Sequence, residues 1–230
     1  YEMTSSLVGS EMCIRDSRSR DKVRCALNHQ NAGSIPVDFG STAVTGIHCR
    51  IVEALRNYYG LAPRPVKIVD AFQMLGEIDA ELAEKIGVDC IGIGGPKDIF
   101  DLDTTRMHEQ TTPWGQRVLV PEAMDLTPDM RGDVYVYAGG DQNYPPSAVM
   151  PKGCYFINAI ERQQPIEEDR LDPEDNVEEF GLLTENDLAY YCAEADKAYQ
   201  TGRAVVASFG GTALGDVACL LYTSPSPRDS

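Results

Sequence analysis

Three short apolar runs, each followed by a glycine-containing loop, constrain the fold of this chain more than any other feature. The runs span residues 35–39, 88–93 and 204–209. Helical patterns, in which apolar residues recur every three to four positions, separate them. Alternating strands and helices are typical of α/β proteins, in which ligands bind at the carboxyl ends of the strands. The sequence therefore predicts an α/β fold with its site in the loops that follow these runs.

Two α/β architectures fit this alternation, a (β/α)8 barrel and a doubly wound open sheet. Dinucleotide-binding sheets carry the order Gly-x-Gly-x-x-Gly between a strand and a helix. The glycines after residue 91 do not have this order, and no helical pattern follows them directly. The missing phosphate loop favours part of a (β/α)8 barrel.

The loop after the first run carries the strongest candidate site. Asp38 either caps the following turn through its carboxylate or points into a pocket at the strand end. Small residues follow it and let a ligand approach the backbone closely. We expect Asp38 to be catalytic, and we expect the substrate-binding residues to be Gly40, Ser41, Thr42, Gly94, Gly95, Phe209 and Gly210.

A helix is predicted over residues 45–59, because Ile47, Ile51 and Leu55 share one helical face. His48 lies in its expected first turn, on the side that faces the strand ends. Since histidine titrates near neutral pH, His48 is the candidate general acid or base. The alternative is a packed histidine that is hydrogen-bonded to the backbone.

The chain divides into three expected regions. Residues 18–97 hold the first β/α units, including a helix predicted over residues 72–86. Residues 98–183 are dense in glycine and proline and are too long for a simple connection, which favours an inserted β-rich cap or lid. Residues 184–218 hold a further helix, begun by a capping-box pattern, and the third apolar run.

The expected cap contains short alternating runs that favour antiparallel strands. Trp114, the single tryptophan of the chain, is either an aromatic residue of a lid over a ligand or part of the core of the cap. The predicted strands lie within residues 117–120, 133–137, 148–150 and 154–156.

The two ends of the chain are predicted to be translated adapter sequence. With one choice of codons, the DNA that encodes residues 219–229 also encodes residues 7–16 on the opposite strand, read from its third base. Such a run of matches does not arise by chance, and the DNA resembles a transposon-type sequencing adapter. We therefore expect residues 1–17 and 219–230 to be adapter and residues 18–218 to be genuine protein sequence.

Composition narrows the classes of partner. The chain has 20 Lys and Arg against 36 Asp and Glu, a net charge of −16, or −14 without the expected adapter (18 against 32). This acidity argues against nucleic-acid and anionic-membrane partners, and no apolar stretch reaches the roughly 18–20 residues that span a bilayer. The cysteines of residues 18–218 lack Cys-x-x-Cys spacing, which favours a reducing cytoplasm. We therefore expect a cytoplasmic protein with a small-molecule substrate.

Several segments resemble the uroporphyrinogen decarboxylase superfamily over nearly all of residues 19–218. They read ALNHQ…IPVDFGSTAVTGIH, VKIVDAFQMLGEID…GVDCIGIGGP, TPWGQ, MPKGCYF and ASFGGTALGD. The resemblance is closest to the methyltransferase-like branch of the superfamily. It implies a TIM (β/α)8 barrel, of which residues 18–218 are roughly the N-terminal half.

Two departures separate the chain from the haem-pathway decarboxylase. That enzyme follows its first strand with an arginine-rich loop, where this chain has residues 38–42. A substrate with many carboxylates needs such fixed cations. The decarboxylase also has an aspartate, which holds the pyrrole N–H groups, where this chain has Ile93, Gly94 and Gly95. Both departures point away from decarboxylation of a porphyrinogen.

The methyltransferase relatives use zinc to deprotonate a thiol acceptor. Their ligands, a His-x-Cys pair and a later Cys, lie in the C-terminal half, and residues 18–218 contain no His-x-Cys. We therefore expect no cofactor within this fragment, zinc in the missing half, and no activity of the fragment alone. Three functions fit: zinc-dependent methyl transfer between a corrinoid protein and a thiol, a lyase that decarboxylates uroporphyrinogen or another acid, and a non-catalytic ligand-binding barrel.

Overall fold

The computed structural model describes residues 19–160 and 183–208, so both expected adapter segments lie outside the described residues. Its helices are α2 (Ser19–Leu27), the 3-10 turn η1 (Ala43–Thr45), α3 (Cys49–Tyr58), α4 (Ala80–Ile86), the 3-10 turn η2 (Ala138–Gly140) and α5 (Glu185–Gln200). Its strands are β1 (Val66–Asp70), β2 (Leu75–Gly76), β3 (Cys90–Ile93), β4 (Met107–Thr111), β5 (Arg117–Pro121), β6 (Val134–Val136), β7 (Ala148–Met150), β8 (Asn158–Ala159) and β9 (Ala204–Ala207). The protein is mixed α/β, and the described strands form several small sheets and no closed barrel.

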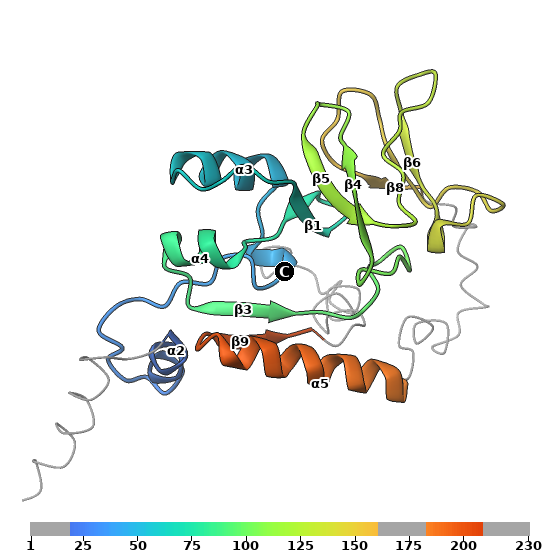
Figure 1. Cartoon of the computed structure of the whole chain (residues 1–230). Helices are drawn as coiled ribbons and strands as arrows, with labels where there is room; N and C mark the ends of the chain where they lie inside the picture. The colour runs from blue at the N-terminus through green and yellow to red at the C-terminus, as the bar shows by residue number, and fades with distance from the viewer. Residues whose placement is uncertain (1–18, 161–182, 209–230) are drawn as a thin grey trace, which may run out of the picture.

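Figure 1 shows how these strands are distributed. The largest sheet has the order β2-β1-β5-β4, in which β1 and β5 are parallel and the other pairs are antiparallel. β6, β7 and β8 form an antiparallel sheet, and β3 pairs in parallel with β9. Because β1 and β2 share a sheet with β5, this sheet joins residues on both sides of the boundary expected at residue 97.

β3 and β9 form the β/α part of the fold. Their register pairs Cys90 with Ala204 and Ile93 with Ala207, and α5, which leads into β9, packs on both strands. A helix that leads from one parallel strand to the next is the repeating unit of α/β folds. Every residue of β3 is nevertheless only half-buried, because the described pair has no further strand at its edges. The run at residues 88–93 therefore forms a strand, as predicted, but not a fully buried one.

The strand predicted at residues 35–39 is wrong, because this segment joins no sheet. It is tied to Asp89 instead. The Asp89 amide donates to the Val37 carbonyl (2.7 Å), and the Val37 amide donates to the Asp89 carboxylate (2.8 Å). Pro36 has no N–H to offer a ladder, and Ile35 is 86% exposed.

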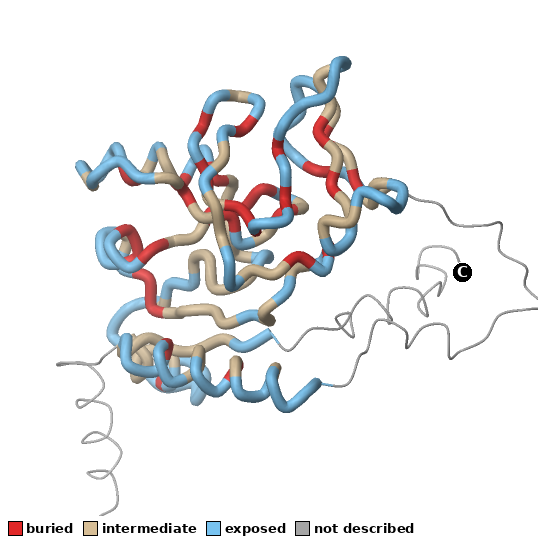
Figure 2. The backbone as a smooth tube through the Cα atoms, turned by 45° about the vertical axis from the view of Figure 1, so that its right-hand side comes forward, coloured by how far each residue is buried: buried red, intermediate tan, exposed pale blue. Residues whose placement is uncertain are grey.

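The described core lies in the expected cap and in the elements that pack on it, and neither β3 nor β9 contributes to it. Figure 2 shows most of the buried positions in the upper part of the view, with a few in the lower helices. The cluster draws on α3, β1, β5, β6 and β7, through Val52, Val66, Ile68, Val118, Val120, Val134, Val136, Ala148 and Met150. Residues 98–160 therefore supply most of the main core cluster of the described chain.

The helix predicted over residues 72–86 is wrong in its first half. α4 begins only at Ala80, and β2 occupies Leu75–Gly76. A Cβ at Gly76 would lie 2.6 Å from Val66 Cγ1 and 2.8 Å from Val52 Cγ2, so the sheet closes on this glycine. Tertiary packing thus overrides the helical spacing of the apolar residues.

The helix predicted over residues 45–59 starts later, at Cys49, and His48 is its N-cap. β4 was not predicted, and residues 154–156 form no strand. Three predicted runs contain strands, β5, β6 and β7. α5 begins as predicted, with a capping box between Thr184 and Asp187. Among the described residues, none of the helices combines the length and the apolar composition that a membrane span needs.

Candidate functional site

The loop that carries Asp38 is a tight turn against β3. The Ser41 hydroxyl donates to Asp38 Oδ2 (2.7 Å), and the Ser41 amide lies 3.3 Å from Asp38 Oδ1. A Cβ on Gly92 would lie 1.7 Å from the Ser41 carbonyl oxygen, so only glycine lets this loop rest on the strand. Gly40 has φ +86° and packs on Ile78. Asp38 therefore caps the turn, while its exposed carboxylate remains open to a ligand.

A second group of contacts lies at the carboxyl ends of β3 and β9. The Tyr191 hydroxyl donates to the Ser208 carbonyl (3.0 Å), and a Cβ on Gly95 would lie 3.1 Å from the same hydroxyl. Burial raises the pKa of Tyr191, as does the nearby Asp187 carboxylate, so its hydroxyl keeps its proton and remains a donor. Tyr191 was not among the site residues expected from the sequence. Phe209 and Gly210, two expected site residues, lie outside the described residues.

His48 lies elsewhere, between α3 and the cap. Its Nδ1 accepts from the Arg50 amide (3.2 Å), and its Nε2 lies 3.0 Å from the Tyr155 carbonyl oxygen. Because Nδ1 accepts and a carbonyl cannot donate, the fitting form is the neutral tautomer with its proton on Nε2. Burial lowers the pKa of His48, and the Arg50 charge lowers it further against the raising effect of the Tyr155 carbonyl. Both ring nitrogens thus form contacts with the backbone. This arrangement is that of the alternative interpretation, a packed histidine, rather than that of a general acid or base.

Aromatic rings surround His48. The ring centroids of Trp114 and Phe156 lie 5.5 and 5.4 Å from that of His48, and Tyr155 lies 6.2 Å away. The Arg50 guanidinium lies over the Tyr155 ring, 4.6 Å from its centroid. Trp114 also packs against the main core, as one of its two sequence interpretations predicted.

Gln116 fastens the cap to the start of α3, and sequence reasoning missed it. Its Nε2 donates to the Cys49 carbonyl (3.0 Å), and its Oε1 accepts from the Trp114 indole (3.1 Å) and from the Cys49 thiol (3.4 Å). The only sequence signal was the TPWGQ turn, whose Gly115 has φ +86°. His48 therefore belongs to a structural junction, apart from the loops at the strand ends.

The cysteines of the described chain do not form a metal centre. Burial raises the pKa of Cys49 to about 12, and burial beside Asp38 and Asp89 raises the pKa of Cys90, so neither is poised as a thiolate. No group of three or more His, Cys, Asp or Glu that could hold a metal is found within residues 19–160 and 183–208. Cys49, Cys90, Cys154 and Cys192 are free thiols.

A cavity of about 580 Å³ opens at the opposite, amino ends of β3 and β9. Lys22 and Asp89 form an ion pair there (2.6 Å), and Arg203 donates to the Val88 carbonyl (2.9 Å). Each cation is already matched by an acceptor, and in α/β folds this end of the strands serves stability. We therefore place the candidate site at the carboxyl ends.

Comparisons with known proteins give no relative: no family model, no curated protein and no solved structure matches the chain.

Proposed function

We propose that the chain is the N-terminal part of a (β/α)8 barrel of the uroporphyrinogen decarboxylase superfamily, with a β-rich cap. The parallel β3–β9 pair, with α5 leading into β9, supports this architecture. So does the half-buried state of β3, since further strands of a barrel would cover its apolar residues. The complete protein would be a zinc-dependent methyltransferase that moves a methyl group between a corrinoid protein and a thiol.

The observation that carries this choice of function is the charge of the first loop. Among residues 38–42, Asp38 supplies the single formal charge, and it is negative and exposed. A negative loop repels a substrate with many carboxylates, which the decarboxylase alternative would have to bind. A thiol and a methyl donor carry no such requirement. Asp38, together with the backbone of Ser41 and Gly95, would bind and orient the acceptor at the strand ends.

Zinc does not fit the described residues, so no step is assigned to it in this part of the chain. No three ligands converge there, and the two more deeply placed thiols, Cys49 and Cys90, are held in the protonated form. In the resemblance, the His-x-Cys pair and the later Cys come from strands beyond Ala218. When bound, zinc would supply the charge that turns the acceptor thiol into a thiolate.

The test uses the protein encoded by a longer clone of the gene, one that continues beyond the codon of Ala218. Its zinc content is measured, and it is incubated with methylcobalamin and a small thiol. Transfer moves the methyl group to sulfur and leaves cob(I)alamin, so thioether appears by mass spectrometry as the cobalamin spectrum changes. Bound zinc and thioether formation would support the proposal. Decarboxylation of uroporphyrinogen would establish the lyase instead, and ligand binding without either reaction would establish the non-catalytic barrel.

Asp38→Asn in that protein tests the site. It removes the charge and keeps a side chain that can accept from Ser41, and we expect thioether formation to fall about 100-fold, the order of loss that misplacing a substrate causes. Asp21→Asn is the control, because the one ion pair of Asp21 within the described residues is with the exposed Arg24. Equal rates in both variants would remove Asp38 from the reaction.

A further inference from the structure

A second cavity, of about 190 Å³, lies between α3, the proline-containing linker that follows it, and β1. It is separate from the loops at the strand ends and plays no part in the proposed function. Arg56, Arg64 and Lys67 line it, together with Glu77 and Asp79. Two carboxylates thus accompany the three cations of its lining, and a third carboxylate, that of Glu81, pairs with Arg56 (3.1 Å).

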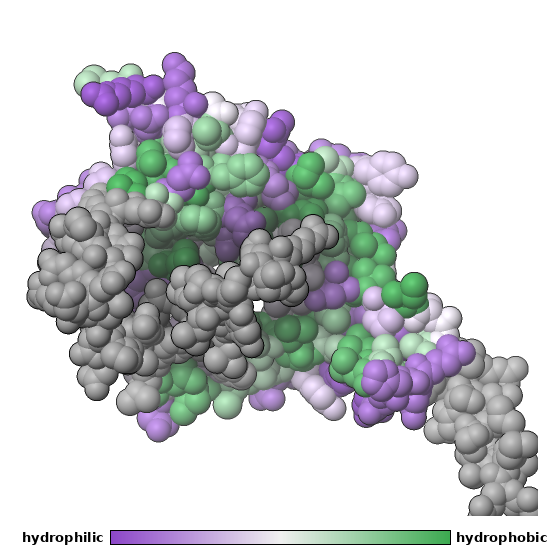
Figure 3. All heavy atoms as spheres, turned by 180° about the vertical axis from the view of Figure 1, so that it is seen from behind, coloured by the Kyte–Doolittle hydropathy of each residue, from purple (hydrophilic) through white to green (hydrophobic). Residues whose placement is uncertain are grey.

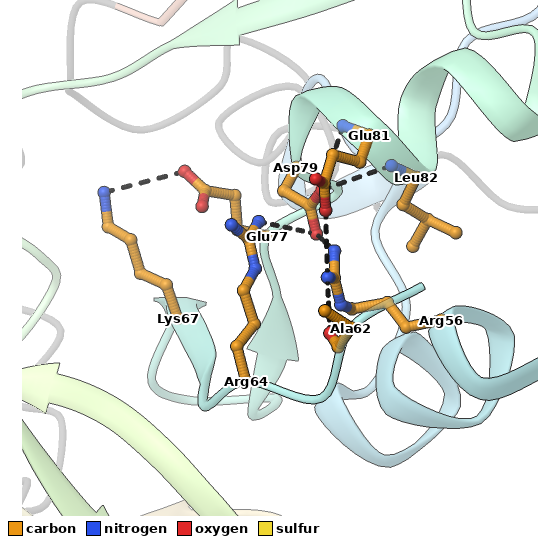
Figure 4. A network of polar contacts seen from close by, with 8 residues as sticks. All are labelled: Arg56, Ala62, Arg64, Lys67, Glu77, Asp79, Glu81 and Leu82. Carbon is orange, nitrogen blue, oxygen red and sulfur yellow. Dashed lines mark hydrogen bonds and ion pairs between the residues drawn. The ribbon is translucent and has the colours of Figure 1, made fainter. Parts of the chain in front are cut away.

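The buried carboxylate of this cavity, that of Asp79, is already fully bonded. Figure 4 shows the contacts around Asp79. Its Oδ1 accepts from the amides of Glu81 (3.0 Å) and Leu82 (3.1 Å), and its Oδ2 accepts from Arg56 and Arg64. Burial would raise the pKa of Asp79, but these amides and guanidinium groups lower it overall, so it stays ionised. Asp79 therefore has little capacity left for further donors.

Donors, by contrast, are left over. Arg64 reaches Asp79 through one terminal nitrogen (2.7 Å), although a guanidinium carries five N–H donors. Lys67 Nζ lies 3.8 Å from Glu77, beyond the 2.7–3.2 Å of an N–H···O hydrogen bond. Arg56 Nε is buried and has no hydrogen-bond partner in the described chain. A cavity with surplus donors suits a ligand that brings acceptors.

Arg64 is also held in place by its neighbours in the chain. Pro63 precedes it and Pro65 follows it, and a following proline restricts Arg64 to extended backbone conformations. Its side chain is 47% exposed, so one part of the guanidinium stays accessible while the other bonds Asp79. A fixed backbone reduces the entropy that binding would otherwise cost.

The remaining wall is apolar, and it includes Val52, Val66 and Leu119. A volume of 190 Å³ equals that of roughly six waters at about 30 Å³ each. This room suits a ligand with one anionic head and a short hydrocarbon body. The planar fork of an arginine matches a carboxylate in particular.

We propose that this cavity binds a short-chain aliphatic carboxylate, whose head pairs with the Arg64 guanidinium and the Lys67 ammonium and whose body lies on Val52, Val66 and Leu119. Because the cavity lies away from the strand ends, carboxylate binding does not depend on methyl-transfer activity. Failure of one proposal leaves the other untouched.

The test is a titration of the whole 230-residue chain with butyrate, at constant ionic strength, with calorimetry and thermal melting as readouts. We expect a dissociation constant of about 1 mM and, at tenfold excess over it, a rise in melting temperature of about 3 °C. Chloride is expected to cause no shift and inorganic phosphate a smaller one. An equal shift with phosphate would overturn the carboxylate assignment, and no shift with any anion would overturn the site.

Variants place the binding at this cavity. Arg64→Lys keeps the charge and loses the fork, and Lys67→Ala removes a loosely paired ammonium without touching the Asp79 contacts; we expect each to weaken butyrate binding about tenfold. Arg117→Ala is the control, because Arg117 pairs with Glu109 on the exposed face of β4 and β5. Equal weakening by Arg117→Ala, or unchanged binding in both cavity variants, would show that butyrate binds elsewhere.

Discussion

His48 shows how one side chain can serve the fold at a position where the sequence left both catalysis and packing open. Its imidazole caps α3 and reaches the Tyr155 carbonyl, so it links a helix to the cap. The sequence placed it correctly near the start of a helix. It could not show the Tyr155 carbonyl, which comes from a residue 107 positions away.

Replacing His48 separates its two contacts. Asn is a favoured N-cap but is too short to reach Tyr155, whereas Ala loses both contacts. We expect His48→Ala to lower the free energy of unfolding by about 2 kcal/mol and His48→Asn by about half as much. Chemical denaturation at pH 7.5 measures both. Equal losses would mean that the hydrogen bond by which His48 caps α3 contributes nothing to stability.

The pH dependence of stability provides an independent check on His48. Its folded pKa is lowered, so its contribution is present above the unfolded value of 6.5 and is lost as pH falls through the folded pKa. We expect the melting temperature to drop below pH 6.5 in the native chain and to drop less in His48→Asn. Identical pH profiles would contradict a neutral His48.

Asp98 is the opposite case, a carboxylate that the fold does not fully satisfy. Its Oδ1 accepts from the amides of Phe100 and Leu102, while its Oδ2 is buried without a partner among the described residues. Burial raises its pKa, and Asp70 and Asp101 add to this. Its contribution to stability is therefore present below the unfolded pKa of about 3.9 and is lost as pH rises through the folded pKa.

Asp98→Asn keeps the Oδ1 acceptor and removes the charge. We expect it to raise the free energy of unfolding at pH 7 by about 1 kcal/mol, because a buried uncompensated charge is costly. The gain should shrink at pH 4, where Asp98 binds a proton. A loss of stability at pH 7 would show that Oδ2 has a partner in solution.

At the scale of elements, the sequence predicts correctly those helices and strands whose ends are fixed by contacts between near neighbours in the chain. It fails where contacts with distant residues decide the structure. α5 begins as predicted because Thr184 and Asp187 bond each other within one turn. The first half of the helix predicted over residues 72–86 does not form, because Gly76 packs closely against Val52 and Val66, which belong to other elements. The strand predicted at residues 35–39 does not form, because this segment is hydrogen-bonded to Asp89 and not to a neighbouring strand. A single sequence carries no direct signal for such long-range contacts.

Substitution of Gly92 tests how closely the loop of residues 38–42 approaches β3. A Cβ there would lie 1.7 Å from the Ser41 carbonyl oxygen, so we expect Gly92→Ala to displace residues 38–42 and to cost about 2 kcal/mol of stability. Limited proteolysis would report the displaced loop. Gly94→Ala is the matched control, because its added Cβ would meet nothing within 4 Å. Similar behaviour of the two variants would contradict the close approach.

The whole molecule has a well-packed part and a poorly covered one. The core gathers around β1, β5 and β6, whereas β3 and β9 are half-buried and Leu27, Ile35 and Val44 are 76%, 86% and 94% exposed. Figure 3 shows apolar groups among hydrophilic ones on the rear face. The sequence predicted the α/β class and the parallel strands, but it did not predict that the main core would form within the expected cap.

These uncovered apolar residues are what a barrel would bury. If the chain continues as we propose, further strands lie beside the β3–β9 pair. Amide hydrogen exchange of β3 in the longer protein should then be slower than in this chain by at least tenfold, because backbone amides inside a barrel open only with the core. Equal exchange in the two proteins would mean that nothing further covers β3.

The most direct test of the central claim is the DNA sequence of the gene beyond the codon of Ala218, read from a longer clone. The account predicts further alternating strand and helix patterns, with His-x-Cys at the end of one strand and another Cys after a later strand–helix unit. A continuation that lacks both the alternation and these residues would contradict the barrel and the zinc-dependent methyl transfer together.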